Sequence, residues 1–277
     1  MILQIRRALS YIIHGVQPKN IHASVSICKS GNRLAGQRII ITGGGRGLGL
    51  AIAKRCSEEG AIVLIAGRNE GTLKQASKEM CDCYYLCYDV SNTSEIESFF
   101  DKAEQLMGGP VTSLVNNAGI SLHEGNIMNV TDDSFDKQLS INLKAPYFLS
   151  KEFIKRYRTN RLTKGSILFM TSERGLYCDD IPYGLIKAAI NSLTKGLGRR
   201  FINDGIRVNA IAPGVTASDM TGYSENGNLY RPQACGERVY LASEVAEIAV
   251  FLLSDESACI SSCIIPSNRG NHLRCDW

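Results

Sequence analysis

The chain has 277 residues, of which 44% are apolar and 21% charged, with a formal net charge of +4 and a mean hydropathy of −0.07. These values exclude an intrinsically disordered chain, because low net charge and abundant aliphatic residues allow a sizeable buried core. They also exclude a helix that crosses a membrane, since no stretch of about 18 residues is both apolar and free of charges.

The positive charge is concentrated at the N-terminus. No Asp or Glu precedes Glu58, whereas nine Lys and Arg residues do, and the remainder of the chain is net acidic. A general nucleic-acid-binding protein presents basic residues across its folded surface, and this remainder does not supply them. We therefore predict no nucleic-acid partner.

Residues 1–35 are predicted to form an N-terminal extension. Apolar residues recur at three- and four-residue spacing up to Val16, while Arg6 and Arg7 lie off that stripe. This pattern predicts a short amphipathic helix that ends at Pro18. An acid-poor amphipathic start is typical of an organelle transit segment or a membrane-surface helix. The alternative, which we favour, is a helix that packs on its own domain or on a neighbouring subunit.

The ten cysteines show no pattern typical of a metal site or of disulfides. One cluster and one spaced pair occur, namely Cys81, Cys83 and Cys87, and Cys259 and Cys263. No pair has CxxC spacing, and the four histidines lie elsewhere, whereas zinc sites combine such ligands. We predict reduced, mostly buried thiols in a cytoplasmic protein, with no metal site.

From Gln37 onward, short β-branched runs alternate with helical segments. The predicted strands are Arg38–Thr42, Ile62–Ala66, Tyr84–Tyr88, Ser113–Asn116, Ser166–Thr171, Arg207–Ala210 and Cys263–Pro266. The predicted helices include Leu48–Glu59, Glu95–Met107, Asp133–Tyr157, Tyr183–Phe201 and Ser243–Leu253. Such alternation predicts one α/β domain over residues 36–277, with a mostly parallel seven-stranded sheet covered by helices on both faces.

The first predicted strand runs directly into a glycine-rich loop, Thr42-Gly-Gly-Gly-Arg-Gly-Leu-Gly49, and then into a helix. Glycines permit a tight turn and a close approach of the backbone, so that a pyrophosphate can lie at the helix N-terminus. Because the loop stands between the required strand and helix, it predicts a dinucleotide site.

The end of the second predicted strand indicates which dinucleotide binds. An NAD-binding protein normally has a carboxylate there for the ribose hydroxyls, but this chain has Gly67 followed by Arg68. Arg68 suits bidentate contact with a 2′-phosphate, and Arg46 in the glycine loop would approach the same group. We therefore favour NADP(H) over NAD(H). The alternative is that both arginines are solvated surface charges.

Tyr183 and Lys187 lie four residues apart on a predicted helix, so their side chains share a face. The ordinary tyrosine pKa of about 10 is too high for ready proton exchange near neutrality. A neighbouring ammonium and an oxidised nicotinamide stabilise the phenolate, which predicts Tyr183 as acid in carbonyl reduction and base in alcohol oxidation. Alone the pattern is weak, since a buried tyrosine ring with a snorkelling lysine is commoner.

Three motifs in this order resemble the short-chain dehydrogenases/reductases, specifically their compact single-domain branch. They are Thr42-Gly-x-x-x-Gly47-x-Gly49, Asn116-Asn-Ala-Gly119 and Tyr183-x-x-x-Lys187. The resemblance covers about residues 36–270 and implies a Rossmann-type doubly wound fold. It also implies a homodimer or homotetramer built on the two long helices Asp133–Tyr157 and Tyr183–Phe201.

By the resemblance, Ser172 orients the substrate oxygen beside Tyr183, Lys187 bonds the nicotinamide ribose, and Asn142 supports a water relay from Lys187. The glycine loop, the two arginines and the resemblance together predict a set of cofactor contacts. These are Thr42, Gly43, Arg46, Gly47, Leu48, Gly49, Arg68, Asp89, Val90, Asn116, Ala118, Gly119, Tyr183, Lys187, Pro213, Gly214, Val215 and Ser218.

Several of these contacts are assigned only by the resemblance. It places Asp89 and Val90 at the adenine ring, and it makes Asn116 the residue that holds the fourth strand against the cofactor. It also places Pro213-Gly214 beside the nicotinamide. Ser218 stands where the family usually has a threonine that bonds the carboxamide.

The sequence departs from the family pattern in two places. The segment between Ser172 and Tyr183 is shorter than usual, which predicts a reshaped substrate pocket. There, Glu173, Arg174 or Tyr177 would meet a polar substrate, or Glu173 and Arg174 would pair in solvent. After the last predicted strand, Ser267-Asn-Arg-Gly270 stands where the family has Asp-Gly-Gly, which leaves dimer against tetramer open.

These features predict an NADP(H)-dependent oxidoreductase that transfers a hydride between nicotinamide and a carbonyl or secondary alcohol. A 3-oxoacyl thioester, a keto sugar and a hydroxysteroid stay open as small-molecule substrates. A mobile lid over residues 219–241, with Met220, Tyr223, Tyr230 and Arg231, would decide among them. The alternative is a catalytically silent NADP(H)-binding regulatory or scaffolding protein. A hydrolase is excluded because no histidine is placed to serve Ser172.

Overall fold

The computed structural model describes residues 19–23, 31–218 and 220–273. The amphipathic helix predicted before Pro18 lies outside the described residues. Among the helices that the structure describes, none is long and apolar enough to cross a membrane.

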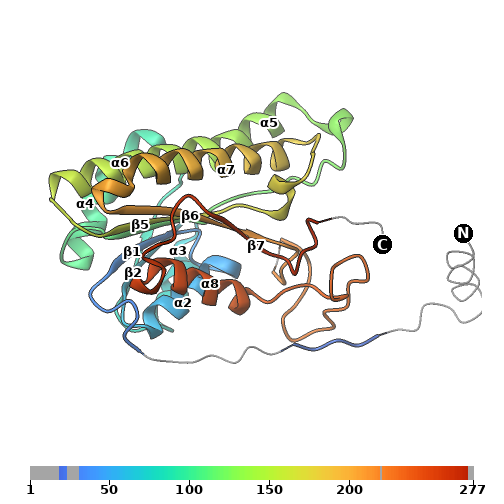
Figure 1. The fold of residues 1–277 in the computed structure, drawn as a ribbon, viewed down its shortest axis with the longest axis horizontal. Coiled ribbons are helices and arrows are strands. Elements are labelled where there is room, and N and C mark those ends of the chain that lie inside the picture. Colours follow the sequence, from blue (N-terminus) through green and yellow to red (C-terminus); the bar gives the residue numbers. More distant parts are fainter. Residues whose placement is uncertain (1–18, 24–30, 219, 274–277) are drawn as a thin grey trace, which may run out of the picture.

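A seven-stranded parallel sheet forms the centre of the molecule, as Figure 1 shows. Its strands are β1 (Arg38–Thr42), β2 (Ile62–Gly67), β3 (Cys83–Cys87), β4 (Ser113–Asn116), β5 (Gly165–Met170), β6 (Ile206–Pro213) and β7 (Ile264–Ser267). They pair in the order β3-β2-β1-β4-β5-β6-β7. The strand order reverses between β1 and β4, and ligands of such sheets bind outside the carboxyl ends at that point. The predicted Rossmann-type doubly wound sheet is confirmed.

Helices cover both faces of the sheet and bury two separate apolar layers. The helices are α2 (Gly47–Glu58), α3 (Glu70–Ser77), α4 (Ile96–Met107), α5 (Asp132–Leu139), α6 (Ala145–Thr159), α7 (Pro182–Phe201) and α8 (Ala242–Leu253). In β1, Ile40 packs toward α4, α6 and α7, whereas Ile39 and Ile41 pack toward α2, α3 and α8. Alternate side chains of a strand point to opposite faces, so this one strand contributes to both layers.

The chain is helical throughout the predicted helix Asp133–Tyr157, but a π-helical turn over Ser140–Lys144 separates it into α5 and α6. Pro146, in the first turn of α6, has no amide hydrogen, and its ring would clash with the carbonyl of Asn142 in a regular helix. A wider π turn relieves that clash, and such turns frequently occur at functional sites.

Helix α3 was not predicted; Asn69 caps it by accepting a hydrogen bond from the Thr72 amide at 2.9 Å.

The described part of the N-terminal extension contacts the domain at two places. Residues 19–23 lie beside the segment after β6, where the Leu229 amide donates to the Ile21 carbonyl at 3.1 Å. Lys19 forms an ion pair with Glu237 in the same segment. Residues 19–23 therefore contact the segment expected to cover the substrate.

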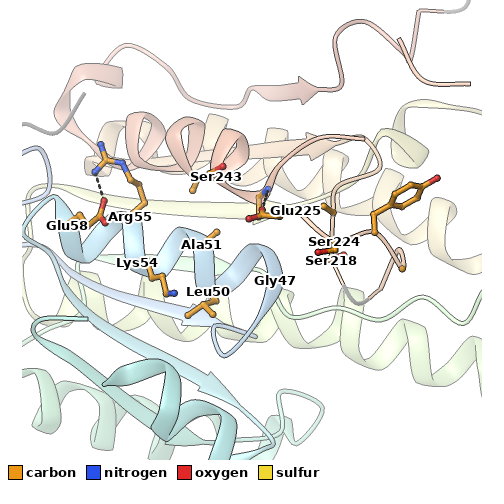
Figure 2. Close-up of a pocket in the computed structure, with 15 residues that line it drawn as sticks. Gly47, Leu50, Ala51, Lys54, Arg55, Glu58, Ser218, Ser224, Glu225 and Ser243 are labelled. Atoms are coloured by element: carbon orange, nitrogen blue, oxygen red, sulfur yellow. Dashed lines mark hydrogen bonds and ion pairs between the residues drawn. The ribbon is translucent and has the colours of Figure 1, made fainter. Parts of the chain in front are cut away.

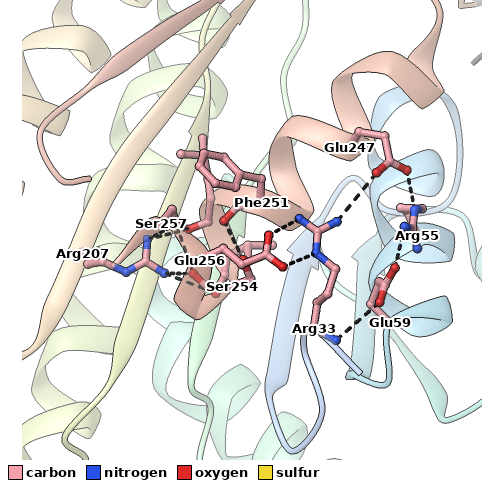
Figure 3. A network of polar contacts seen from close by, with 11 residues as sticks. Arg33, Arg55, Glu59, Arg207, Glu247, Phe251, Ser254, Glu256 and Ser257 are labelled. Carbon is pink, nitrogen blue, oxygen red and sulfur yellow. Dashed lines mark hydrogen bonds and ion pairs between the residues drawn. The ribbon is translucent and has the colours of Figure 1, made fainter. Parts of the chain in front are cut away.

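The second contact is a charged network at the base of α2 and α8, drawn in Figure 3. Arg33 donates two hydrogen bonds to Glu256, at 3.1 and 2.7 Å, and lies 3.9 Å from Glu247. Arg55 in α2 pairs with Glu247 and with the fully buried Glu59. These shared carboxylates attach the extension to both helices.

The described cysteines are free thiols, and most of them are exposed. The prediction of mostly buried thiols is therefore wrong. Cys83 and Cys87 lie on β3, which is an edge strand, so one side of their strand has no neighbour to cover it. Cys56 is buried in α2, and burial raises the pKa of its thiol to about 12. Over residues 19–23, 31–218 and 220–273, no group of three or more His, Cys, Asp and Glu side chains could hold a metal ion.

Candidate active site

The glycine loop connects the end of β1 to the start of α2. Gly43 and Gly47 have φ values of 66° and 54°, a left-handed conformation that favours glycine. A Cβ on Gly49 would lie 2.3 Å from the Gly43 carbonyl oxygen, so only glycine fits there. The side chain of Arg46, at the N-cap, makes no capping hydrogen bond to α2. Open amides and a closely approaching backbone are what a pyrophosphate requires at a helix N-terminus.

Asn117 fastens the end of β4 to this loop, whereas the family resemblance makes its neighbour Asn116 the residue that holds β4 against the cofactor. The Asn117 side chain donates to the carbonyl oxygens of Thr42 and Gly43, at 2.9 and 3.2 Å. The Thr42 hydroxyl accepts from the amides of Asn117 and Ala118, both at 3.0 Å. Thr42 and Asn117 thus hold the loop at the switch point of the sheet.

Asn116 points to the other side of the sheet. Its side chain is buried and donates to the Ser150 hydroxyl of α6 at 3.1 Å. Neighbouring residues on a strand face opposite sides, so only one of the two asparagines can reach the glycine loop. The motif Asn116-Asn-Ala-Gly119 contains two adjacent asparagines, and this repetition was the sequence signal that could have identified Asn117.

The predicted adenosine contacts lie at the carboxyl ends of β2 and β3. The backbone of Gly44 passes so close to β2 that a Cβ there would lie 2.6 Å from the Ile65 side chain, so only glycine fits. Arg68 is exposed directly after β2. Asp89 accepts hydrogen bonds from the amide and hydroxyl of Ser91, at 2.9 and 2.7 Å. Burial acts to raise the Asp89 pKa, but these bonds and the charge of Arg68 lower it below its ordinary value.

The predicted nicotinamide contacts lie at the end of β6 and in the segment that follows. The Gly214 amide donates to the Ser267 carbonyl at 3.1 Å, which joins this turn to β7. Ser218 approaches the glycine loop, since a Cβ on Gly47 would lie 3.8 Å from it. A pocket of about 650 Å³ opens beside Gly47 and Ser218, between α2, α8 and residues 217, 218 and 222–225, as Figure 2 shows. Val90 follows Asp89 after β3, and Val215 follows Gly214 after β6.

Tyr183, Lys187 and Ser172 meet at the carboxyl end of β5. Helix α7 begins at Pro182, which places Tyr183 in its first turn and Lys187 one turn later. The Lys187 ammonium lies 5.5 Å from the centre of the Tyr183 ring and donates to the Met170 carbonyl at 2.7 Å. The Ser172 side chain forms a hydrogen bond with Tyr183. A carbonyl oxygen placed between the two hydroxyls could accept from both.

Burial controls the ionisation of this group of side chains. It raises the pKa of Tyr183, and the opposing hydrogen bond from Ser172 and charge of Arg174 do not offset it. Burial lowers the pKa of Lys187 to about 8. Without a bound nicotinamide, Tyr183 is therefore a protonated phenol near neutral pH. It is in the form that can donate a proton.

Asn142 lies behind the group in the π-helical turn. Its side chain accepts from the Ile120 amide at 2.9 Å and donates to the Ile120 carbonyl at 2.8 Å. A Cβ on Gly119 would lie 3.2 Å from the Asn142 oxygen and 3.8 Å from the Lys187 ammonium. The four predicted catalytic side chains are thus close together around Gly119 and the end of β5.

The short loop between Ser172 and Tyr183 differs from both alternatives that the sequence left open. Arg174 forms a bidentate ion pair with Asp179, at 2.6 and 2.7 Å, and not with Glu173. Glu173 is 8% exposed and accepts hydrogen bonds from Asn268 and Asn271. The loop side chains proposed as substrate contacts are therefore paired within the protein.

Comparisons with known proteins agree with this arrangement. The profile of a family described as "Enoyl-(Acyl carrier protein) reductase" matches residues 43–272. The 3-oxoacyl-[acyl-carrier-protein] reductase FabG of Rickettsia bellii is 32% identical over 245 residues, which cover 86% of this chain and 97% of that protein. Galactitol 2-dehydrogenase of Rhizobium johnstonii is 29% identical over 248 residues, 86% of this chain and 96% of that protein.

A solved structure is similar along nearly its whole length. It is that of a 3-ketoacyl-(acyl-carrier-protein) reductase from Brucella melitensis complexed with NADH. It superposes with a TM-score of 0.79 at 25% identity and covers 86% of this chain and 99% of that chain.

Proposed function

The chain belongs to the short-chain dehydrogenase/reductase family, whose members are oxidoreductases acting on CH–OH and C=O groups, and from this premise we propose that it reduces 3-oxoacyl thioesters with NADPH. The observation that carries the proposal is the meeting of Tyr183, Ser172 and Lys187 at the carboxyl end of β5. The 3-oxoacyl reductases among the relatives support the substrate class.

The residues of the site suit the binding of a dinucleotide. The open amides of α2 and the glycine positions would hold the pyrophosphate, and Lys187 would bind the ribose next to the nicotinamide. The bound cofactor supplies the hydride. Ser172 orients the substrate carbonyl oxygen, and Tyr183 donates its phenolic proton to that oxygen as negative charge develops there. Lys187 stabilises the resulting phenolate by its charge.

The test of this function is a substrate panel. We expect purified protein to oxidise NADPH in the presence of acetoacetyl-CoA, with a higher kcat/KM than on a keto sugar or a ketosteroid. Galactitol with NADP⁺ tests the polyol activity after which one relative is named. A higher kcat/KM on galactitol would replace the proposed substrate class. Binding of NADPH without turnover on any carbonyl would indicate the silent dinucleotide-binding protein instead.

We propose NADPH as the preferred cofactor because Arg68 follows β2 and Arg46 lies in the glycine loop, with no carboxylate at the end of β2. Arg68→Asp is expected to raise the NADPH Kd about 10-fold or more, since it replaces a charge-assisted contact with a repulsive one. The NADH Kd should change little. Fluorescence titration of both cofactors measures this. Arg200→Asp, at the far end of α7, is the matched control, and an equal effect on NADPH there would contradict the assignment.

We also propose a homodimer formed through α5, α6 and α7. These helices carry exposed apolar side chains, namely Phe135, Tyr147, Phe148 and Leu185. Exposed apolar side chains grouped on neighbouring elements are typical of protein interfaces. Light scattering in solution tests the assembly, and a monomer would contradict it.

A cytoplasmic location is proposed as well, because exposed free thiols persist in a reducing compartment. Alkylation of fresh cell extract followed by mass measurement tests it. Disulfide-bonded protein in that extract would contradict it.

A further inference from the structure

The two places where the sequence departs from the family pattern contact each other. The loop after β5 and the turn after β7 are far apart in the chain. Because β5, β6 and β7 are parallel neighbours, both segments lie at the carboxyl ends of these strands. The carboxylate of Glu173 accepts hydrogen bonds from the side chains of Asn268 and Asn271, both at 3.0 Å. Glu173 is 8% and Asn268 1% exposed, so this is a buried contact.

The Asn268 donor of this contact is held by further hydrogen bonds. The Asn268 side-chain oxygen accepts from the Gly270 amide at 3.2 Å and lies 3.0 Å from a ring nitrogen of His272. The Asn268 carbonyl accepts from the Tyr240 hydroxyl at 2.7 Å. With its oxygen occupied on this side, the Asn268 amide nitrogen is directed at Glu173. A buried carboxylate requires such donors, because an unpartnered one is costly.

Glu173 is the residue next to Ser172, so the contact bears directly on the site. Ser172 begins the 3-10 turn Glu173–Leu176, and its hydroxyl accepts from the Arg174 amide at 3.2 Å. The same turn is held from α7, where the Asn191 side chain donates to the Gly175 carbonyl at 3.0 Å. The turn is thus fixed to α7 on one side and, through Glu173 and the neighbouring Tyr177, to the turn after β7 on the other.

We propose that Glu173 is a positioning residue, whose buried carboxylate sets the place of Ser172 by tying its loop to Asn268 and Asn271. The inference rests on the proposed function, in which Ser172 orients the substrate carbonyl. A displacement of a reacting group by 1 Å can cost as much as about 10²-fold in rate. The two departures from the family pattern therefore interact directly: Asn268, in the turn after β7, donates a hydrogen bond to the carboxylate of Glu173 in the shortened loop.

The decisive variant is Asn268→Asp. It keeps the oxygen that the Gly270 amide needs but replaces the donor to Glu173 with a second carboxylate. We expect kcat to fall about 10-fold or more at neutral pH, with smaller changes in KM and in the NADPH Kd. The double variant Glu173→Gln/Asn268→Asp restores a donor and an acceptor, and it should recover most of the lost kcat. Asn203→Asp, exposed near the end of α7, is the matched control.

A pH profile separates positioning from a general loss of structure. In Asn268→Asp, one carboxyl of the pair takes up a proton as the pH falls and can then donate to the other, so kcat should recover toward the wild-type value. Other ionisable groups face this pair, namely Tyr177, Tyr240, His272 and Arg269. They are unchanged in the double variant, which has one carboxylate and should show no such recovery.

The possible outcomes are distinct. An unchanged kcat in Asn268→Asp would overturn the positioning role, and so would a loss that neither acid nor the double variant rescues. Absence of turnover by the wild-type enzyme would instead overturn the proposed function. In that case crystal structures of the same variants are compared, in which Asn268→Asp should displace Ser172 and the double variant should restore its position.

Discussion

Replacing Tyr183 with Phe is expected to lower kcat for carbonyl reduction by about 10²- to 10⁴-fold, the usual contribution of a general acid, while the protein still binds NADPH. The phenyl ring keeps the packing at the start of α7 and the contact with Lys187. Only the hydroxyl is lost, and with it the proton that must reach the substrate oxygen. Steady-state kinetics on acetoacetyl-CoA and fluorescence titration with NADPH measure the two quantities.

Tyr157→Phe is the matched control for this variant. Tyr157 is a buried tyrosine of α6, whose hydroxyl donates to the Asp204 carbonyl at 2.9 Å, at the other end of the sheet. The Tyr157→Phe variant should lose some stability of folding and keep the wild-type kcat. A wild-type kcat in Tyr183→Phe would contradict the assignment of the acid. Loss of NADPH binding in that variant would show that the effect is structural.

Replacing Lys187 with Met is expected to lower kcat and also to stabilise the cofactor-free protein. A charge that stabilises the phenolate is lost, which should lower kcat by about 10²-fold. The buried ammonium is costly to the folded state, since burial lowers the Lys187 pKa to about 8, against about 10.4 in the unfolded chain. That shift corresponds to roughly 3 kcal/mol, and loss of the hydrogen bond to Met170 offsets about 1 kcal/mol of it.

The stability advantage of Lys187→Met over the wild-type protein should decrease as the pH rises. Below pH 8 the lysine is protonated in both states, and the folded wild-type protein bears the full cost of the buried charge. As the pH rises from about 8 to 10.4, the folded chain releases its proton while the unfolded chain keeps it, so wild-type stability rises relative to the variant. The difference between the two proteins should therefore shrink over this range.

Urea unfolding at neutral pH and near pH 10, without cofactor, measures this difference. Lys195→Met, exposed on the same helix, is the control and should show neither the gain nor its pH dependence. If Lys187→Met is less stable than wild type at neutral pH, or if its advantage grows with pH, the buried ammonium does not carry the cost assigned to it.

The sheet and the glycine-rich loop were both readable from the sequence. Short β-branched runs such as Ile39–Ile41, bounded by turn residues, become strands buried on both faces, as a parallel sheet covered by helices requires. Gly43 and Gly49 were also readable, since left-handed backbone and absent space for a Cβ both restrict the position to glycine. Local steric rules act within a few residues, and the sequence displays them directly.

Tertiary structure alone decided which side chains meet. Asn116 and Asn117 have the same chemistry, and only the register of β4 against the neighbouring layers sends one to α6 and the other to the glycine loop. The partners of Glu173 lie beyond β6 and β7 in the chain, so their pairing exists only because those strands bring the two turns to one edge. Hydrogen bonds between such distant residues depend on the whole packing, and no local pattern in the sequence specifies them.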